Sequence, residues 1–178
     1  MKTRGPYKVL SSKTVYKNPW IEVKEDNVVR GGKKITFGII NYKPGVSIVA
    51  LDEDKNIYLV KEFYYAINEY GIQVPSGGIE KGQSSLDGAK AELLEETGLA
   101  AKKWISLGFV HPLTMILNSP ADLFIALNVQ KNREPEKGIE LVKIPLEEAY
   151  QMVIDSKIVH AQSCVAILKA KIWLDKNG

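Results

Sequence analysis

The sequence predicts an α+β fold in which a mixed sheet carries helices on its faces. Three observations support this prediction. The first seventy residues read as strands and tight turns, one strong helical segment follows a glycine-rich loop near residue 80, and two more helical segments close the chain. The element order of strands, helix, strands and two helices fits a single sheet with helical layers.

The N-terminal part is expected to be a small antiparallel β extension covering residues 1–43. Trp20-Ile-Glu-Val-Lys alternates between apolar and polar residues, and Gly31-Gly32 is a hairpin signal inside Val28–Phe37. Pro44-Gly45 marks a natural boundary. Residues 44–178 then form the main domain, because about forty residues could hardly bury a core alone.

The main domain begins with two apolar strands. Val46–Leu51 is rich in β-branched residues, Asp52-Glu-Asp-Lys-Asn supplies a turn, and a second strand follows from Ile57 to Ala66.

The next element is a helix over residues 85–97. Ser84 or Ser85 can cap its first turn, Asp87 completes a relaxed capping box with Ser84, and Gly98 supplies a left-handed stop.

Later strands are predicted at Trp104–Val110, Leu123–Val129 and Ile139–Ile144. Pro145 then opens a helix that continues to Ile154, and residues 159–174 form the closing helix.

Composition excludes several function classes. The net charge of +3 is mild and the lysines are scattered, which gives no support for nucleic-acid binding. No stretch reaches the length of an apolar membrane span, and the first residues lack an apolar signal region, so a cytoplasmic protein is expected. The single Cys164 has no second cysteine for a disulfide or zinc site, and a buried core position is expected for it.

The residues that indicate chemistry lie on the helix at 85–97. Glu92, Glu95 and Glu96 stand at i, i+3 and i+4, so their carboxylates share one face within one turn. Carboxylate oxygens suit Mg²⁺, which keeps waters for a phosphate group to replace. An acidic triplet on a helix is more often a solvated face. The preceding loop adds Gly77 and Gly78, which allow the backbone to approach a ligand or metal closely, but these glycines alone are a weak signal.

Loop and helix together resemble the Nudix family. The Nudix box reads Gly, five residues, Glu, seven residues, Arg-Glu, an apolar residue, any residue, Glu-Glu, any residue, Gly and an apolar residue. Anchored on Gly77, this chain matches at Glu92, Leu93, Glu95, Glu96, Gly98 and Leu99. It departs at Gln83, where the family has the first Glu, and at Ala91, where the family has Arg.

The resemblance implies a Nudix-type α/β/α sandwich and a metal site. Glu92 and Glu96 would be the main ligands of Mg²⁺ or Mn²⁺, and Glu95 would be a further ligand or the base for the attacking water. The backbone carbonyl of Ser76 would be another metal ligand.

Segments outside the box resemble the ADP-ribose pyrophosphatase branch, in particular Lys61-Glu-Phe-Tyr-Tyr65 and Gln73-Val-Pro-Ser-Gly. In that branch the N-terminal sheet commonly mediates a homodimer, so we expect a dimer. The expected substrate-binding residues are Trp20, Lys61, Tyr64, Gln73, Gly77 and Gly78. Tyr64 stands where relatives often carry a phosphate-binding Arg, and Gln73 stands where they often carry a Glu.

The expected activity is Mg²⁺-dependent hydrolysis of a nucleoside diphosphate linked to another group, foremost ADP-ribose, giving AMP and ribose 5-phosphate. The substrate would be a small nucleotide, and neither nucleic acid nor membrane is an expected partner. A nucleotide sugar such as GDP-mannose, or a Nudix-like nucleotide-binding domain with weakened catalysis, stays open. A loop carboxylate could act as a base, with Asp122, Glu134 and Glu136 as candidates.

Overall fold

The computed structural model describes residues 2–177 and divides them into two compact units. Unit 1 contains residues 2–43 together with His111–Pro120, and unit 2 contains Pro44–Val110 together with 121–177. Each unit is built around its own sheet.

Unit 1 is a five-stranded sheet in the order β1-β2-β3-β4-β11. Its strands are β1 (Thr3–Arg4), β2 (Tyr7–Lys17), β3 (Ile21–Arg30), β4 (Lys33–Tyr42) and β11 (Leu117–Asn118). The predicted hairpin is confirmed, because Arg30 pairs with Lys33 around Gly31 and Gly32, and both glycines have positive φ.

The segment His111–Pro120 joins unit 1, although the sequence placed it in the main domain. The reason is a non-local pairing: β11 runs parallel to β4, with Leu117 opposite Ile40. The Ser119 hydroxyl also donates to the Lys43 carbonyl across 2.8 Å. The predicted boundary at residue 43 therefore matches the end of the first segment of unit 1 but leaves out the second segment, His111–Pro120. The division of the chain into two domains stays a proposal.

Unit 2 is built on a mixed sheet in the order β10-β12-β5-β6-β14, with β7 on β6 and β8 on β5. The strands are β5 (Gly45–Leu51), β6 (Asn56–Tyr64), β7 (Glu69–Gln73), β8 (Ser76–Gly78), β10 (Lys103–Val110), β12 (Ala121–Leu127) and β14 (Glu140–Pro145). A separate small pair joins β9 (Leu99–Ala100) to β13 (Gln130–Lys131). The sheet is mixed because β12 runs parallel to β5, while all other strand pairs of this sheet are antiparallel.

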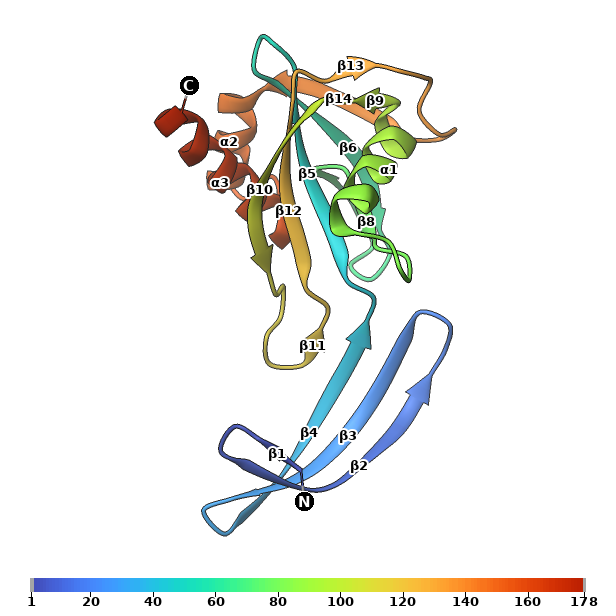
Figure 1. Cartoon of the computed structure of the whole chain (residues 1–178), viewed down its shortest axis with the longest axis vertical. Helices are drawn as coiled ribbons and strands as arrows, with labels where there is room; N and C mark the ends of the chain where they lie inside the picture. Colours follow the sequence, from blue (N-terminus) through green and yellow to red (C-terminus); the bar gives the residue numbers. More distant parts are fainter. Residues whose placement is uncertain (1, 178) are drawn as a thin grey trace. The chain divides into compact units, whose positions relative to one another are not determined.

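Helices cover both faces of this sheet (Figure 1). The helix α1 (Ser85–Thr97) lies on one face, and α2 (Leu146–Ile154) and α3 (Ala161–Asn177) lie on the other. The predicted helices are confirmed, with α3 beginning two residues later and ending three residues later than expected from 159–174.

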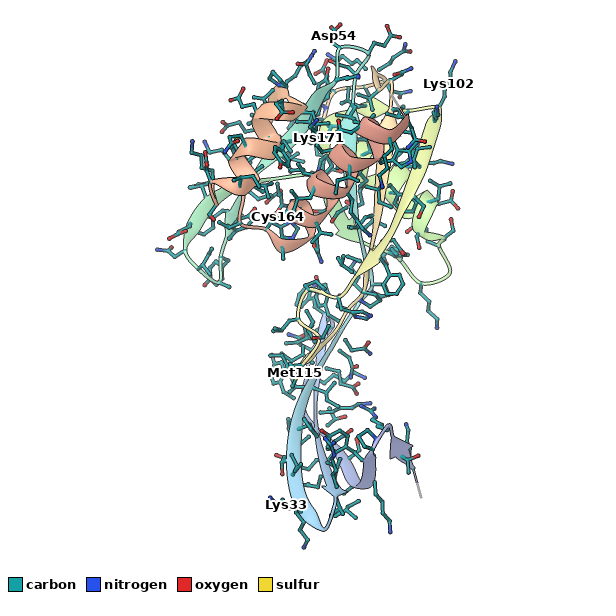
Figure 2. The ribbon with its side chains drawn as sticks, turned by 90° about the vertical axis from the view of Figure 1, so that its left-hand side faces the viewer. Lys33, Asp54, Lys102, Met115, Cys164 and Lys171 are labelled. Carbon is teal, nitrogen blue, oxygen red and sulfur yellow. The ribbon has the colours of Figure 1, made fainter. Side chains whose placement is uncertain are left out.

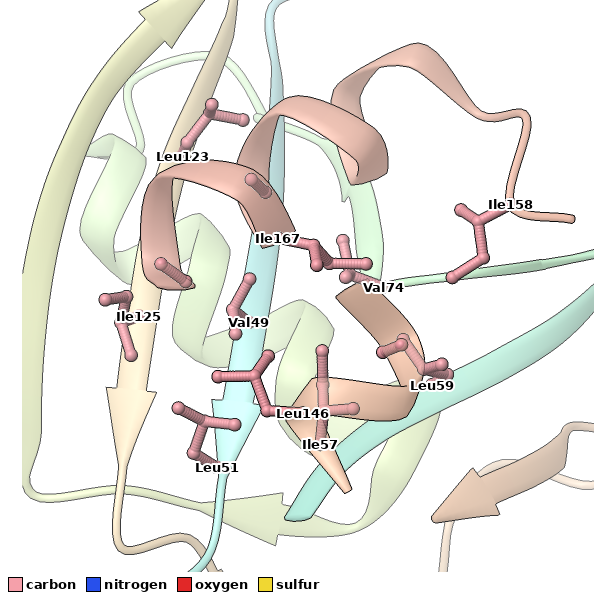
Figure 3. Packing of buried hydrophobic residues seen from close by; sticks show 13 residues of the cluster. Val49, Leu51, Ile57, Leu59, Val74, Leu123, Ile125, Leu146, Ile158 and Ile167 are labelled. Carbon is pink, nitrogen blue, oxygen red and sulfur yellow. The ribbon is translucent and has the colours of Figure 1, made fainter. Parts of the chain in front are cut away.

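The strand β5 feeds two hydrophobic cores by alternation. Val46, Ile48 and Ala50 pack with Ala89 and Leu93 of α1. On the other face, Val49 and Leu51 pack with residues of α2 and α3, including Leu146 and Ile167 (Figure 3). A strand buried on both sides has an almost continuous apolar sequence, as seen here. The predicted α+β sandwich is confirmed.

Cys164 lies on α3 (Figure 2), where it packs against the hydrophobic core as expected but is half-buried rather than fully buried. Its thiol donates to the Ile158 carbonyl across 3.1 Å. Within residues 2–177, no helix has both the length and the apolar character of a membrane span.

Candidate active site

The helix α1 is fixed at both ends by the residues that the sequence singled out. The Ser84 side chain caps the first turn and accepts from the Asp87 N–H across 3.1 Å. At the other end Gly98 adopts a left-handed φ of 69°, and its N–H bonds to the Leu94 carbonyl. The caps fix where the helix begins and ends, and the packing of Ala89 and Leu93 against β5 sets the direction of its acidic face.

The three acidic side chains lie at the edge where α1 meets the sheet. Leu93 is fully buried against β5. The residues before and after it on the helix lie progressively further from the sheet-facing side. Glu92 and Glu96 are half-buried and Glu95 is exposed. The acidic face is therefore partly withdrawn from solvent rather than fully solvated.

The short strand β8 supplies the partner of this acidic edge. Ser76 pairs with Ser47 of β5, and the Ser76 N–H donates to Glu96 Oε2 across 2.9 Å. At the next residue, a Cβ atom built on Gly77 would lie 2.0 Å from Glu92 Oε1. Only glycine leaves room for the Glu92 carboxylate against the backbone in this position. Ser76, Gly77, Glu92 and Glu96 are thus brought together, as the sequence predicts.

Glu96 has a strongly raised pKa. Burial raises the pKa of Glu96 to about 8, and the negative charges of Glu92, Glu62 and Glu95 act in the same direction. The hydrogen bond from the Ser76 N–H partly opposes this rise. Three neighbouring carboxylates therefore disfavour the charged form of Glu96.

Glu62 is the acidic residue that the sequence reasoning missed. It lies on β6, two positions after Val60 and four positions after Tyr58. Tyr58 packs against the α1 core, and side chains two apart along a strand share a face. This alternation places Glu62 on the α1 side, and it was the signal available in the sequence.

The donor set suits a divalent cation, although the ligands are not gathered around one point. Carboxylate oxygens and a backbone carbonyl are the ligands that Mg²⁺ prefers, and a cation would offset the mutual repulsion that raises the pKa of Glu96. Among residues 2–177, no three or more His, Cys, Asp or Glu side chains are already arranged to hold an ion.

A loop after β13 covers the C-terminal end of α1. The Glu136 N–H donates to the Glu95 carbonyl across 2.9 Å, and the N–H groups of Asn132 and Arg133 both donate to the Gly98 carbonyl. Glu134 forms an ion pair with Lys131 and is exposed. Of the candidate loop bases, Glu136 is therefore attached to the acidic edge through its backbone, whereas Glu134 is turned to a lysine.

Gln83 is engaged in the loop before α1. Its side-chain carbonyl accepts from the Glu80 N–H across 3.1 Å, and its own N–H donates to the Glu80 carbonyl. Asp122 is also engaged near the start of α1, where it accepts a hydrogen bond from the Ser85 hydroxyl. Gln83 therefore stabilises the loop before α1, and Asp122 contacts the first turn of the helix.

The predicted substrate-binding residues separate into different places. Gln73 is buried beside the acidic edge, and its amide donates to the Ser76 hydroxyl across 3.2 Å. Lys61 is paired with Glu140 at 3.0 Å, and it alternates with Glu62 along β6, so it points to the opposite face.

The Tyr64 side chain packs inside unit 2 and is not directed to solvent. Its ring lies against Gly71, where an added Cβ would come within 2.1 Å of the ring, and its hydroxyl oxygen is buried without a hydrogen-bond partner. Burial raises the pKa of Tyr64 to about 12. Trp20 belongs to unit 1, where it follows β2 with 68% of its surface exposed.

Comparison with known proteins decides the family. The NUDIX domain model matches residues 41–158. The chain belongs to the Nudix family. A second family model, the nucleoside diphosphate sugar hydrolase N-terminal domain, matches residues 7–35. The predicted Nudix enzyme is thereby confirmed, and its N-terminal segment is of a kind that recurs in nucleoside diphosphate sugar hydrolases.

Individual relatives agree with this assignment. The ADP-ribose pyrophosphatase of Bacillus subtilis is 25% identical, with 90% of this chain and 92% of that protein covered. The methanol dehydrogenase activator of Bacillus methanolicus is 20% identical, with 90% of each covered. A crystal structure of an ADP compounds hydrolase superposes with a TM-score of 0.86 at 20% identity, covering 100% of this chain and 99% of the other. That structural likeness supports the fold.

Proposed function

We propose that this Nudix protein hydrolyses the pyrophosphate bond of an ADP-linked compound, with ADP-ribose as the foremost substrate and AMP and ribose 5-phosphate as products. The observation that carries the proposal is the acidic edge of α1 held against β8, where Ser76 bonds to Glu96 and Gly77 adjoins Glu92. The similarity to the Bacillus subtilis ADP-ribose pyrophosphatase supports the choice of substrate.

Nudix hydrolases generally use divalent metal ions such as Mg²⁺. We propose that Glu92, Glu96 and the Ser76 carbonyl hold such an ion here, with Glu95 as a further ligand or as the base for water. When bound, Mg²⁺ would neutralise charge on the pyrophosphate and lower the pKa of a bound water.

The chain's own groups have distinct roles in this proposal. The Ser76 N–H holds one oxygen of Glu96, which leaves the other oxygen available as a ligand. Glu95 is exposed at the same edge and can therefore reach a water molecule. Its backbone carbonyl is already fixed by the Glu136 N–H, so only its side chain has freedom to move.

Release of AMP from ADP-ribose, measured with and without Mg²⁺, tests the proposal. GDP-mannose and other nucleotide sugars should be assayed beside it, because the match to the nucleoside diphosphate sugar hydrolase N-terminal domain keeps them in consideration. Faster turnover of a nucleotide sugar than of ADP-ribose would move the substrate assignment while retaining the reaction.

Glu96→Gln should lower turnover by orders of magnitude with the fold intact, because one ligand charge is lost. Glu148→Gln is the matched control, since Glu148 is an exposed residue of α2 on the other face of the sheet. Unchanged turnover in the Glu96 variant would show that the acidic edge is not the active site.

A nucleotide-binding role with weak turnover is the alternative from a different class. Ala91 and Gln83 favour it, because each replaces a charged residue of the Nudix box and the Gln83 side chain is hydrogen-bonded to the Glu80 N–H. Binding of ADP-ribose without hydrolysis, in the presence of Mg²⁺ or Mn²⁺, would support this alternative over the enzyme.

We also propose that the protein is a homodimer that uses the sheet of unit 1. This sheet exposes several large apolar side chains, namely Leu10, Val15, Tyr16, Trp20, Ile35 and Tyr42. Such apolar side chains on a sheet commonly mark protein contacts. A monomeric mass by light scattering at micromolar concentration would contradict the dimer.

A further inference from the structure

A buried serine on α3 bonds to the backbone just before the acidic edge. Ser163 is 0% exposed, and its hydroxyl oxygen accepts from the Val74 N–H across 3.0 Å. Val74 follows the end of β7, so its N–H has left the strand ladder and would otherwise be buried without a partner. Val74 also lies beside Ile167 of α3 in the core (Figure 3). The serine therefore satisfies a backbone group and fixes where this segment meets α3.

His160 is a second hydrogen-bond partner of that hydroxyl. His160 Nδ1 lies 2.8 Å from Ser163 Oγ, and burial lowers the pKa of His160, so the ring is neutral near pH 7. A neutral Nδ1 without its proton accepts the hydroxyl hydrogen, which leaves the oxygen lone pairs for Val74. We call Ser163 and His160 together the α3 anchor.

One residue, Pro75, separates Val74, which the α3 anchor binds, from Ser76 at the acidic edge. Pro75 restricts the backbone, and its carbonyl accepts from the Ile48 N–H across 2.9 Å. The next N–H is that of Ser76, which donates to Glu96 Oε2. The segment 74–76 is thus held by α3, then by β5, and then by a carboxylate of α1. A shift of Val74 would be transmitted to Ser76 because so few bonds lie between them.

We propose that Ser163 and His160 are positioning residues for the acidic edge, which set the place of the Ser76 backbone and through it the orientation of Glu96. This inference rests on the proposed function for its catalytic consequence, whereas the geometric part concerns residues 74–76 alone. The α3 anchor lies on the opposite face of the sheet from α1.

Ser163→Ala should weaken binding of Mn²⁺, measured by electron paramagnetic resonance, by about 10- to 100-fold, as is usual when a group that orients a metal ligand is lost. Turnover at saturating substrate should fall with it, while KM for the nucleotide changes little. The amide proton of Ser76 should move upfield in the NMR spectrum of the metal-free variant, because its bond to Glu96 lengthens.

Two further variants separate positioning from general stability. His160→Asn keeps a polar group near the Nδ1 position and should restore most of the Mn²⁺ affinity that His160→Ala loses. Cys164→Ala is the matched control, since its thiol is bonded to Ile158 and the residue is the immediate neighbour on α3. It should leave the Ser76 amide shift and Mn²⁺ affinity unchanged.

Unchanged Mn²⁺ affinity and an unchanged Ser76 amide in a folded Ser163→Ala protein would overturn the proposal. An equal loss in Cys164→Ala would overturn it too, because the effect would then be one of general destabilisation. If Ser163→Ala does not fold, His160→Ala and His160→Asn decide by the same two measurements. If the wild-type protein neither binds Mn²⁺ nor turns over ADP-ribose, the proposed function fails, and the Ser76 amide shift still tests the α3 anchor.

Discussion

The Ser76 N–H and the Glu96 carboxylate are joined by a hydrogen bond of 2.9 Å that connects β8 to α1. The bond lies in a place where burial and neighbouring carboxylates disfavour the charged form of Glu96. When Glu96 is charged, a backbone donor to its carboxylate is worth more than a neutral hydrogen bond, so this contact partly offsets the cost of burial and repulsion.

The stability of the metal-free protein should depend on the protonation of Glu96. The folded-state pKa of Glu96 is raised from about 4.5 to about 8, so its contribution to stability is fully present below about 4.5 and is lost as the pH rises through about 8. Urea unfolding of metal-free protein at several pH values in this window should therefore show a falling free energy of unfolding. Glu96→Gln should flatten the slope. A wild-type profile that rises with pH across the same window would refute the assignment.

Gly77→Ala should damage the metal site more than the fold. The new Cβ would lie 2.0–2.4 Å from the Glu92 carboxylate atoms, which sit at the far end of a flexible side chain and can move away. Mn²⁺ affinity and turnover should fall at least about tenfold, as for other disturbed ligand orientations, with a small change in Tm. Gly38→Ala is the control, because nothing lies within 4 Å of a Cβ at that position. Retained Mn²⁺ affinity in Gly77→Ala would place the ion elsewhere.

Glu62→Gln should lower the pKa of Glu96 in the metal-free protein. Glu62 contributes negative charge that raises this pKa, and glutamine removes the charge with little change in size. The carboxyl ¹³C shift of Glu96, followed by NMR against pH, measures the effect. Glu69→Gln on the neighbouring β7 serves as the comparison, since Glu69 is an exposed residue. An unchanged pKa of Glu96 in this variant would mean that the Glu62 charge is screened from Glu96.

Gly98→Ala should destabilise the protein by two separable effects. Positive φ at a residue with a Cβ costs about 1–3 kcal/mol, and the added Cβ would also lie 2.2 Å from the Arg133 carbonyl oxygen. Gly138→Ala isolates the first effect, because Gly138 has a φ of +93° with nothing within 4 Å. Urea denaturation of both variants should show the larger loss for Gly98. Equal losses would mean that the 132–136 loop moves aside freely.

Local patterns explain why α1 and its acids could be predicted from the sequence. Ser84, Asp87 and Gly98 are caps whose effect is confined to the helix ends, and the helical repeat then fixes Glu92, Glu95 and Glu96 on one face. The glycine at 77 follows the same logic, since close approach to a side chain demands a residue without Cβ. These inferences needed no knowledge of distant parts of the chain.

Long-range pairings explain what the sequence left out. The parallel contact of β11 with β4 joins residues more than seventy positions apart, and nothing local to Leu117 indicates it. The same holds for Ser163 and Val74, which are 89 positions apart. Lys61 was expected to bind substrate from its place in a family-like segment, but its partner Glu140 comes from a strand 79 positions away.

The double-sided burial of β5 limits how this domain can change during evolution. Substitutions in Val46–Leu51 must preserve volume towards α1 at even positions and towards α2 and α3 at odd positions. Insertion of one residue would exchange the two sets of side chains and spoil both cores at once, and it would also shift the partners of β8 and β12. Length variation among descendants of this chain is therefore expected in its turns, such as the one at Asp52–Lys55, while β5 keeps a constant length.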